Sequence, residues 1–211
     1  MHHAIFVIST FAALALFTAA VLQDPLPGDK SVALFVQRLH FPGMLETMES
    51  VTWIGNGPTI GILGALLVAL LWLARMRMAA YAAAATVVLM YTSILLKILV
   101  DRPRPADDFL LRITHDFQGM GFPSGHAFQT TLLFGLLISI LAIHLRPGWL
   151  RLTIQGTLVL FIGAVGLSRI YLGAHWPSDV LGGYLAAIPI ALGIFLLHRR
   201  AHEAALANLP A

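Results

Sequence analysis

The chain has 211 residues, of which 58% are hydrophobic and only 11% are charged, and its formal net charge is +3. Soluble domains carry about a quarter charged residues, so this composition excludes an ordinary soluble protein and indicates a membrane protein. The length fits one domain, residues 1–211. The sequence lacks the Lys/Arg runs that bind nucleic acid. It also lacks cysteine, which excludes disulfides and thiolate metal sites.

Six apolar stretches have about the length that crosses a bilayer as a helix, roughly 20 residues. They are 4–22, 57–74, 78–96, 128–145, 152–167 and 180–197, and the short fifth stretch is expected to continue toward Tyr171. Backbone polar groups in lipid must pair within their own segment, so the sequence predicts an all-α bundle of six transmembrane helices. The first stretch lacks a basic n-region and is long for a signal peptide, so we interpret it as an uncleaved helix.

The segment 24–56 mixes charged and apolar residues. Its apolar residues recur at helical spacing (Val32, Phe35, Val36 and Leu39), which is typical of an amphipathic helix in the membrane interface. Pro42-Gly43 is expected to end this helix before a second helical pattern begins at Met44. Two interpretations of the segment stay open: a lid or lipid-entry element, or a packed connector.

Six spans alternate sides, so the ends of the third and fifth stretches share a membrane face with the starts of the fourth and sixth. The opposite face carries six basic residues: Arg75, Arg77, Arg146, Arg151, Arg199 and Arg200. The first face has seven Lys and Arg residues, but nine of the ten acidic residues accompany them. Short basic loops stay in the cytoplasm, so the first face is expected to point outward, toward the periplasm in a bacterial inner membrane.

Three clusters of polar residues fall on this outward face. They are Lys97 followed after six residues by Arg104-Pro105; Pro123-Ser124-Gly125-His126; and Ser168-Arg169 followed after five residues by His175 and after three more by Asp179. Arginine binds phosphate oxygens in pairs, and lysine adds a compact charge. A helix beginning at Ser124-Gly125 offers free N–H groups and the positive end of its dipole to an anion. The sequence therefore predicts a phosphate site built without metal.

Two histidines supply reactive groups beside this predicted site. Asp179 lies one helical turn after His175, where its carboxylate can fix the tautomer of a nucleophilic imidazole. His126, at the start of another helix, can protonate the leaving oxygen and later activate water. This pattern predicts hydrolysis through a phosphohistidine intermediate.

The three clusters resemble the signature of the type 2 phosphatidic acid phosphatase (PAP2) family, K-x6-RP, PSGH and SR-x5-H-x3-D, which the region 97–179 matches at every position. The resemblance implies one membrane lipid phosphatase domain with His175 as the nucleophile, His126 as the acid and base, and Asp179 as its partner. It also implies a phosphate site formed by Lys97, Arg104, Ser124, Gly125, His126 and Arg169. The implied substrates are undecaprenyl diphosphate, phosphatidic acid, phosphatidylglycerol phosphate and lipid A phosphates, with undecaprenyl diphosphate favoured.

Other polar residues are given no catalytic role. Arg102 and Arg112 have no place in the signature and are interpreted as solvated loop charges that could at most touch a lipid head group. The histidines without a carboxylate at useful spacing are interpreted as interface or tail residues, namely His2, His3, His40, His144, His198 and His202. His115 is a weaker candidate for the substrate rim. Asp107 and Asp108 have no third ligand nearby, so neither a metal site nor a cofactor is predicted.

Three other functions are weighed against hydrolysis. A lipid phosphotransferase would use the same residues and pass the phosphate to another lipid, and the sequence does not separate it from a hydrolase. The vanadium haloperoxidases share the anion pocket but are soluble, which the six apolar stretches oppose. A transporter would carry charges within its spans, whereas here they gather at helix ends. The sequence leaves the oligomeric state open.

Overall fold

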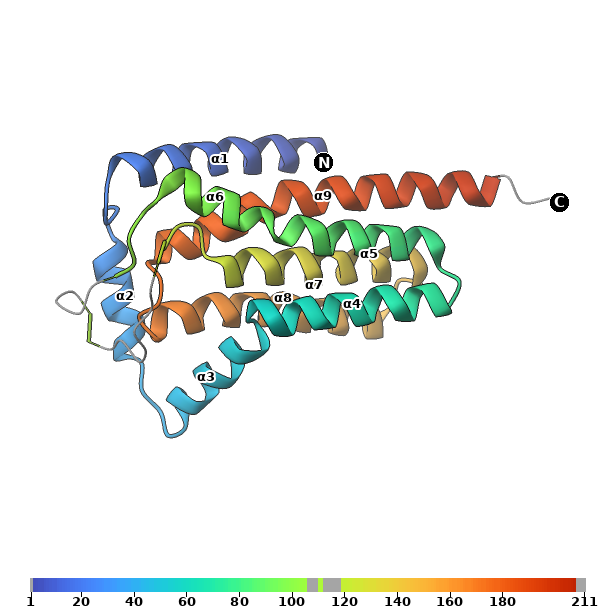
Figure 1. Ribbon diagram of the computed structural model, residues 1–211. Helices are drawn as coiled ribbons and strands as arrows, with labels where there is room; N and C mark the ends of the chain where they lie inside the picture. Colours follow the sequence, from blue (N-terminus) through green and yellow to red (C-terminus); the bar gives the residue numbers. More distant parts are fainter. Residues whose placement is uncertain (1, 106–109, 112–118, 208–211) are drawn as a thin grey trace.

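The structure, a computed structural model, describes residues 2–105, 110–111 and 119–207. These residues form α1 (His2–Leu22), α2 (Asp29–Arg38), α3 (Met44–Ile54), α4 (Gly57–Leu73), α5 (Arg77–Met90), α6 (Thr92–Val100), α7 (Gly125–His144), α8 (Trp149–Tyr171) and α9 (Pro177–Ala207). Most of the longer helices run side by side along one direction, while α2 lies across one end of the bundle and α3 departs at an angle (Figure 1).

Within the part of the chain that the structure describes, five segments are long and apolar enough to span a membrane: Ala4–Leu22, Arg77–Val100, Gly125–His144, Trp149–Tyr171 and Pro177–Ala205. The second of these combines α5 and α6, which are separated at Tyr91. A sixth span is obtained if α3 and α4, bent by 49° at their junction, are taken together. The predicted all-α membrane bundle is therefore confirmed, and the second predicted stretch, 57–74, corresponds to α4 of this bent pair.

Helix α7 is the central helix, and it packs against α9, α8, α5 and α4 (Figure 1). In its apolar window 56% of residues are buried, compared with 11% to 28% in the other four spans. Its hydroxyl residues satisfy their own helix, since Thr131 donates to the Ala127 carbonyl and Ser139 to that of Gly135. The outer helices instead expose large apolar side chains such as Phe11 and Leu160, as expected for surfaces that face lipid.

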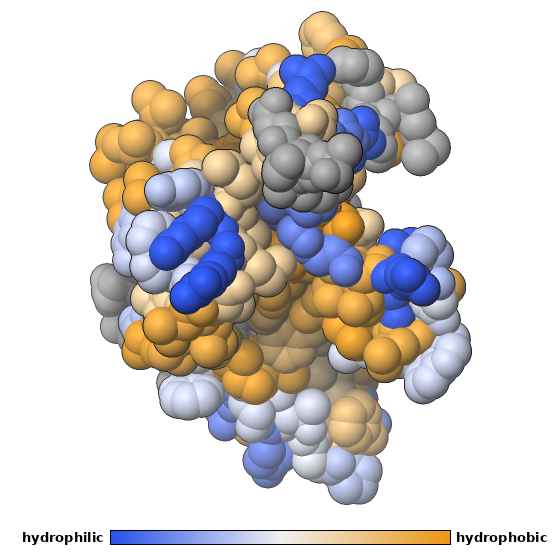
Figure 2. All heavy atoms as spheres, turned by 90° about the vertical axis from the view of Figure 1, so that its right-hand side faces the viewer, coloured by the Kyte–Doolittle hydropathy of each residue, from blue (hydrophilic) through white to orange (hydrophobic). Residues whose placement is uncertain are grey.

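The two ends of the bundle differ in charge. At the end opposite α2, the turn between α4 and α5, the loop between α7 and α8, and the last turns of α9 carry Arg75, Arg77, Arg146, Arg151, Arg199 and Arg200. Figure 2 views this end and shows hydrophilic side chains spaced around a rim with hydrophobic atoms between them. The predicted gathering of basic residues at one end is thus found in the structure.

The segment after α1 forms two helices, α2 and α3, as its spacing and the Pro42-Gly43 break predict. The apolar residues of α2 lie on different sides of the helix: Val36 is buried, whereas Val32 and Phe35 are 47% and 66% exposed. The buried side of α2 also includes polar Gln37, because it packs against backbone at the ends of α8 and α9 as well as against apolar side chains.

Candidate active site

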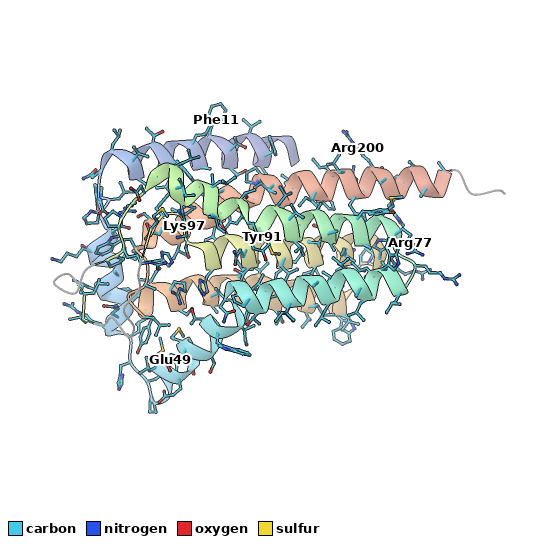
Figure 3. All side chains as sticks on the ribbon, in the orientation of Figure 1. Phe11, Glu49, Arg77, Tyr91, Lys97 and Arg200 are labelled. Atoms are coloured by element: carbon cyan, nitrogen blue, oxygen red, sulfur yellow. The ribbon has the colours of Figure 1, made fainter. Side chains whose placement is uncertain are left out.

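The three predicted clusters meet at the end of the bundle that α2 crosses. Lys97 lies in the last turn of α6, Arg169 in the last turn of α8, and Asp179 in the first turn of α9. His175 lies in the short turn between α8 and α9, and His126 is the second residue of α7. In Figure 3, Lys97 is found toward this end, whereas Arg77 and Arg200 lie toward the other.

The imidazole of His175 is held between a cation and a carboxylate. Its Nε2 lies 3.2 Å from Nη1 of Arg104, and its Nδ1 lies 3.4 Å from Oδ2 of Asp179. A guanidinium only donates hydrogen bonds, so Nε2 is the acceptor and the ring proton belongs on Nδ1, toward Asp179. The Nδ1 contact is close enough for an ion pair but does not have hydrogen-bond geometry within the described residues.

The ring of His175 is also kept neutral. The residue is only 1% exposed, and burial lowers its pKa well below the ordinary value. The positive charges of Arg104, Arg169 and Lys97 add to this shift. A neutral ring with its proton on Nδ1 leaves the Nε2 lone pair available for attack on an electrophile.

Asp179 is fixed by the start of its own helix and by neighbouring chain segments. Its Oδ2 accepts the Trp176 N–H at 2.9 Å, which is the reciprocal half of a capping box. Its Oδ1 accepts from Arg102 at 2.9 Å, and its backbone carbonyl accepts the Ser124 N–H at 2.9 Å. The carboxylate is 0% exposed, so its position relative to His175 is set entirely by protein contacts.

Three cations act on the imidazole of His175: Arg104 beside Nε2, and Lys97 and Arg169 through their charges. Lys97 donates to the carbonyls of Met120 at 2.7 Å and Gly121 at 3.3 Å, and Arg104 donates to the carbonyl of Ala174 at 2.8 Å. Arg169 donates to the hydroxyl of Thr52 at 2.7 Å. Burial lowers the pKa of the Arg104 guanidinium, and Asp179 opposes this shift. Arg169 is buried and the other two cations are half-buried, and cations gathered in this way favour the binding of an anion.

The start of α7 completes the site. Ser124 occupies the N-cap position that was predicted, but its side chain makes no capping hydrogen bond. Its hydroxyl is buried and has no hydrogen-bond partner among the described residues, so it can donate to an anion. A Cβ on Gly125 would lie 3.8 Å from Cε of Lys97, which places this glycine against the cations. His126 is subject to the field of the same three cations.

Arg102 is the main residue that the sequence interpretation misplaced. It was expected to be a solvated loop charge, but it is 2% exposed and contacts Asp24, Asp29, Ser178 and Asp179. Its position two residues before Arg104, on the face that holds most acidic residues, was the available signal. Arg112, His115, Asp107 and Asp108 lie outside the described residues.

The segment 24–56 supplies two further supports that were not predicted. Thr52 of α3 accepts from Arg169 and also lies 3.2 Å from the hydroxyl of Ser168. Gln37 of α2 donates to the carbonyls of Ile170 and Tyr171 at the end of α8. Both side chains contact the last turn of α8, which carries Arg169, so this segment packs against the site.

Three histidines lie together at the end of the bundle opposite the site. His144, His198 and His202 form a group at the opposite end, with ring centroids of His144 and His202 4.6 Å apart and those of His144 and His198 5.5 Å apart. His198, interpreted as an interface or tail residue, is 3% exposed and therefore buried within the protein at that end. Its ring is buried because α9 continues past the predicted end of the span and packs beside α7.

Comparison with known proteins finds the family that the three clusters of the site resemble. The family model of the PAP2 superfamily matches residues 78–203. The chain is 32% identical over 168 residues to decaprenylphosphoryl-5-phosphoribose phosphatase of Mycobacterium tuberculosis, covering 79% of this chain and 85% of that protein. It is 37% identical over 83 residues to the bacitracin transport permease protein BcrC of Bacillus licheniformis, but this match spans only 36% of that relative.

A solved structure shares the fold over nearly the whole chain. It is that of the transmembrane PAP2 type phosphatidylglycerolphosphate phosphatase from Bacillus subtilis, with a TM-score of 0.69, 22% identity, and 96% of both chains covered. The family match covers more than half of the sequence and includes every residue of the three clusters. This chain belongs to the PAP2 superfamily of membrane lipid phosphatases.

Proposed function

We propose that this protein hydrolyses a phosphate group on a membrane lipid through a covalent phosphohistidine at His175. The observation that carries the proposal is the environment of the ring, with Nε2 directed at Arg104 and Nδ1 at Asp179. A bound phosphate would give Arg104, Arg169 and Lys97 a charged hydrogen-bond acceptor in place of neutral ones. Hydrogen bonds that involve charged groups are about twice as strong as those between neutral groups.

In the first step, Nε2 of His175 attacks phosphorus. The N–P bond forms while the bond from phosphorus to the leaving oxygen breaks, and His126 gives that oxygen a proton. The phosphate brings about 1.5 to 2 negative charges at neutral pH. These charges offset the field of the three cations, and they favour the protonated form of His126 that the step requires. Asp179 stabilises the positive charge that develops on the ring of His175.

In the second step, His126 takes a proton from water, and the water oxygen attacks phosphorus. The new O–P bond forms as the N–P bond breaks, which releases inorganic phosphate and restores neutral His175. The hydroxyl of Ser124 and the N–H groups at the start of α7 stabilise the negative oxygens in both steps. The cations supply the charge stabilisation, so we expect the reaction to proceed in the presence of a chelator.

A groove in the membrane-spanning part of the protein suits the lipid chain. It has a volume of about 500 Å³ and is lined by Gly57, Pro58, Gly61, Ile62, Ala65, Met90, Tyr91 and Gln129. Gln129 lies one helical turn after His126 on α7, so the groove begins next to the reacting groups. A chain in this groove would hold the head group at the end of the bundle.

Among lipids, we propose a polyprenyl phosphate or diphosphate, with undecaprenyl diphosphate as the first candidate. The M. tuberculosis relative is named for a polyprenyl-linked phosphate, and the match covers most of both chains. The gathering of basic residues at the opposite end supports placing the site on the extracytoplasmic face of the inner membrane.

The test is phosphate release by the purified protein from four lipids, namely undecaprenyl diphosphate, phosphatidic acid, phosphatidylglycerol phosphate and a lipid A phosphate. No acceptor lipid is added, and a chelator is present. The proposal expects inorganic phosphate from undecaprenyl diphosphate with the highest kcat/KM. Preference for another lipid would overturn the substrate assignment alone. Release that requires an acceptor lipid would indicate a phosphotransferase, and release that requires magnesium would contradict the metal-free site.

A further inference from the structure

Arg102 lies behind Asp179, on the side of the carboxylate away from His175. Its side chain is 1% exposed, and its described hydrogen bonds all end on protein oxygens. Its Nη1 reaches Oδ1 of Asp179, while the opposite oxygen, Oδ2, faces Nδ1 of His175. Arg102 therefore acts on the imidazole of His175 only through the carboxylate of Asp179.

The guanidinium of Arg102 uses its planar fork to join three chain segments. Its Nε donates to Asp24 at 2.7 Å, its Nη2 to Asp29 at 2.9 Å, and its Nη1 to both the Ser178 hydroxyl at 2.7 Å and Asp179 at 2.9 Å. Such a set of directed bonds fixes orientation, which a lysine ammonium would do less well.

The charges around Arg102 keep it protonated. Burial disfavours its charged form, but the carboxylates of Asp179, Asp29 and Asp24 outweigh this, and the pKa of the guanidinium is raised. A permanent positive charge 2.9 Å from Asp179 favours the ionised carboxylate, despite the burial of that side chain. An ionised partner is what a positively charged imidazole needs during the reaction.

Asp29 extends the support to the first turn of α9. Its Oδ1 accepts the Ser178 N–H at 2.9 Å, and its Oδ2 accepts the Ser178 hydroxyl at 2.6 Å and the Leu26 N–H at 2.9 Å. The start of α2 therefore caps the start of α9 from outside, next to the residue that faces His175. Arg102 donates hydrogen bonds to both helix starts and so fixes their position relative to each other.

We propose that Arg102 is a positioning residue that holds Asp179 ionised and oriented toward Nδ1 of His175. The inference rests on the proposed function, because it assumes that His175 is the nucleophile. Arg102 does not contact the bound phosphate in this arrangement. Replacement of Arg102 is therefore expected to lower the rate of the chemical step without weakening the binding of the substrate.

The test compares Arg102→Gln and Arg102→Lys with Arg38→Gln, a control at an exposed arginine of α2 outside the network. Arg102→Gln is expected to lower kcat by about 10- to 100-fold, as loss of a partner behind a functional ligand does, with KM within about twofold of the wild type. Arg102→Lys keeps the charge without the fork and is expected to have an intermediate kcat. Arg38→Gln is expected to match the wild type.

A double-mutant cycle shows whether Arg102 acts through Asp179. In the Asp179→Asn background, replacing Arg102 is expected to cause no further loss of kcat, because the group on which it acts is gone. Multiplicative losses, a raised KM, or a wild-type kcat in both Arg102 variants would overturn the proposal. If Arg102→Gln does not fold, the same outcomes are read from Arg102→Lys. Failure of the proposed function is separate, since it would appear as no phosphate release by the wild type or as full release by His175→Ala.

Discussion

The backbone N–H of Ser124 donates to the carbonyl of Asp179 at 2.9 Å, so the first residues of α7 and α9 are joined directly. These two helix starts carry the groups that we assign to acid–base and nucleophilic chemistry, His126 on α7 and His175 just before α9. The distance between the two imidazoles therefore depends on how closely α7 and α9 approach.

Gly183 permits this approach, and we expect Gly183→Ala to impair both stability and turnover. An added Cβ would lie 2.7 Å from the Ser124 carbonyl oxygen, which is closer than packed atoms allow, so α7 and α9 would have to separate. Overpacking of this kind costs about 1–3 kcal/mol. The measurements are the apparent Tm in detergent and kcat.

The matched control is Gly193→Ala, farther along the same helix, where an added Cβ meets nothing within 4 Å. It is expected to keep the wild-type kcat and a Tm at least as high as that of the wild type, because alanine favours the helix more than glycine does. An equal loss in the two variants would mean that the contact with Ser124 does not cause the loss.

Replacement of the two histidines is expected to separate the two chemical steps. His175→Ala removes the nucleophile and should reduce phosphate release to background. His126→Ala removes the group that activates water, so a substrate with a good leaving group should leave phosphate on the protein. The measurement is acid-labile radioactive phosphate on the protein after rapid quenching. Label on His175→Ala, or turnover of that variant near the wild-type rate, would refute the assignment of the nucleophile.

The pH dependence of stability is expected to carry a contribution from His175. Burial lowers the pKa of His175 in the folded protein, so below about pH 6.5 the unfolded chain binds a proton that the folded one does not. Stability from this group is therefore complete above that pH and is lost as the pH falls, with a slope of at most about 1.4 kcal/mol per pH unit.

Apparent Tm values of the wild type and His175→Gln at pH 7, 6 and 5 test this contribution. The wild type is expected to lose more of its Tm toward pH 5 than the variant, whose side chain does not titrate. Parallel curves would show that the folded protein tolerates a protonated His175.

The meeting of the three clusters at one end of the bundle could be predicted because their residues lie in short local patterns at the ends of apolar stretches. It did not predict Arg102, because the burial of Arg102 depends on Asp24 and Asp29, 78 and 73 residues earlier in the chain. The partnership of Thr52 with Arg169 is likewise a contact over 117 residues. Periodicity and local motifs carry no information about such pairs, whereas alternation of the spans was enough to bring the three signature clusters to one end.

Other features of the helices also depend partly on local contacts and partly on contacts with distant segments. Asn56 was not recognised as a cap, yet its side chain accepts the Thr59 N–H at 2.8 Å and begins α4 after the 49° bend. The burial of Gln37 on α2 was not predicted and has a tertiary cause, since backbone carbonyls at the end of α8 offer acceptors to Gln37. Hydrophobic spacing alone could not reveal those acceptors.

The orientation in the membrane can be tested with single cysteines, since the natural sequence contains none. His40→Cys lies at the end with the site, and Gly148→Cys lies in the loop between α7 and α8 at the opposite end; both positions are exposed. We expect a membrane-impermeant maleimide to label His40→Cys in intact spheroplasts, and Gly148→Cys only after lysis. The reverse pattern would place the site in the cytoplasm.

Filling the groove beside the site is expected to affect only substrates with a long chain. Gly61 lines the groove, and its nearest neighbour is the hydroxyl of Tyr91, 3.8 Å from an added Cβ. A tryptophan at this position would occupy space that we assign to the lipid, and each buried methylene that loses its contacts costs about 0.8 kcal/mol. Gly61→Trp should therefore lower kcat/KM about tenfold or more for a polyprenyl substrate, while a short soluble phosphomonoester is hydrolysed as before.

Gly163→Trp, at an exposed glycine of α8 with open space around it, is the control and should change neither value. An equal loss with both substrates would mean that the groove supports the shape of the site and does not hold the chain.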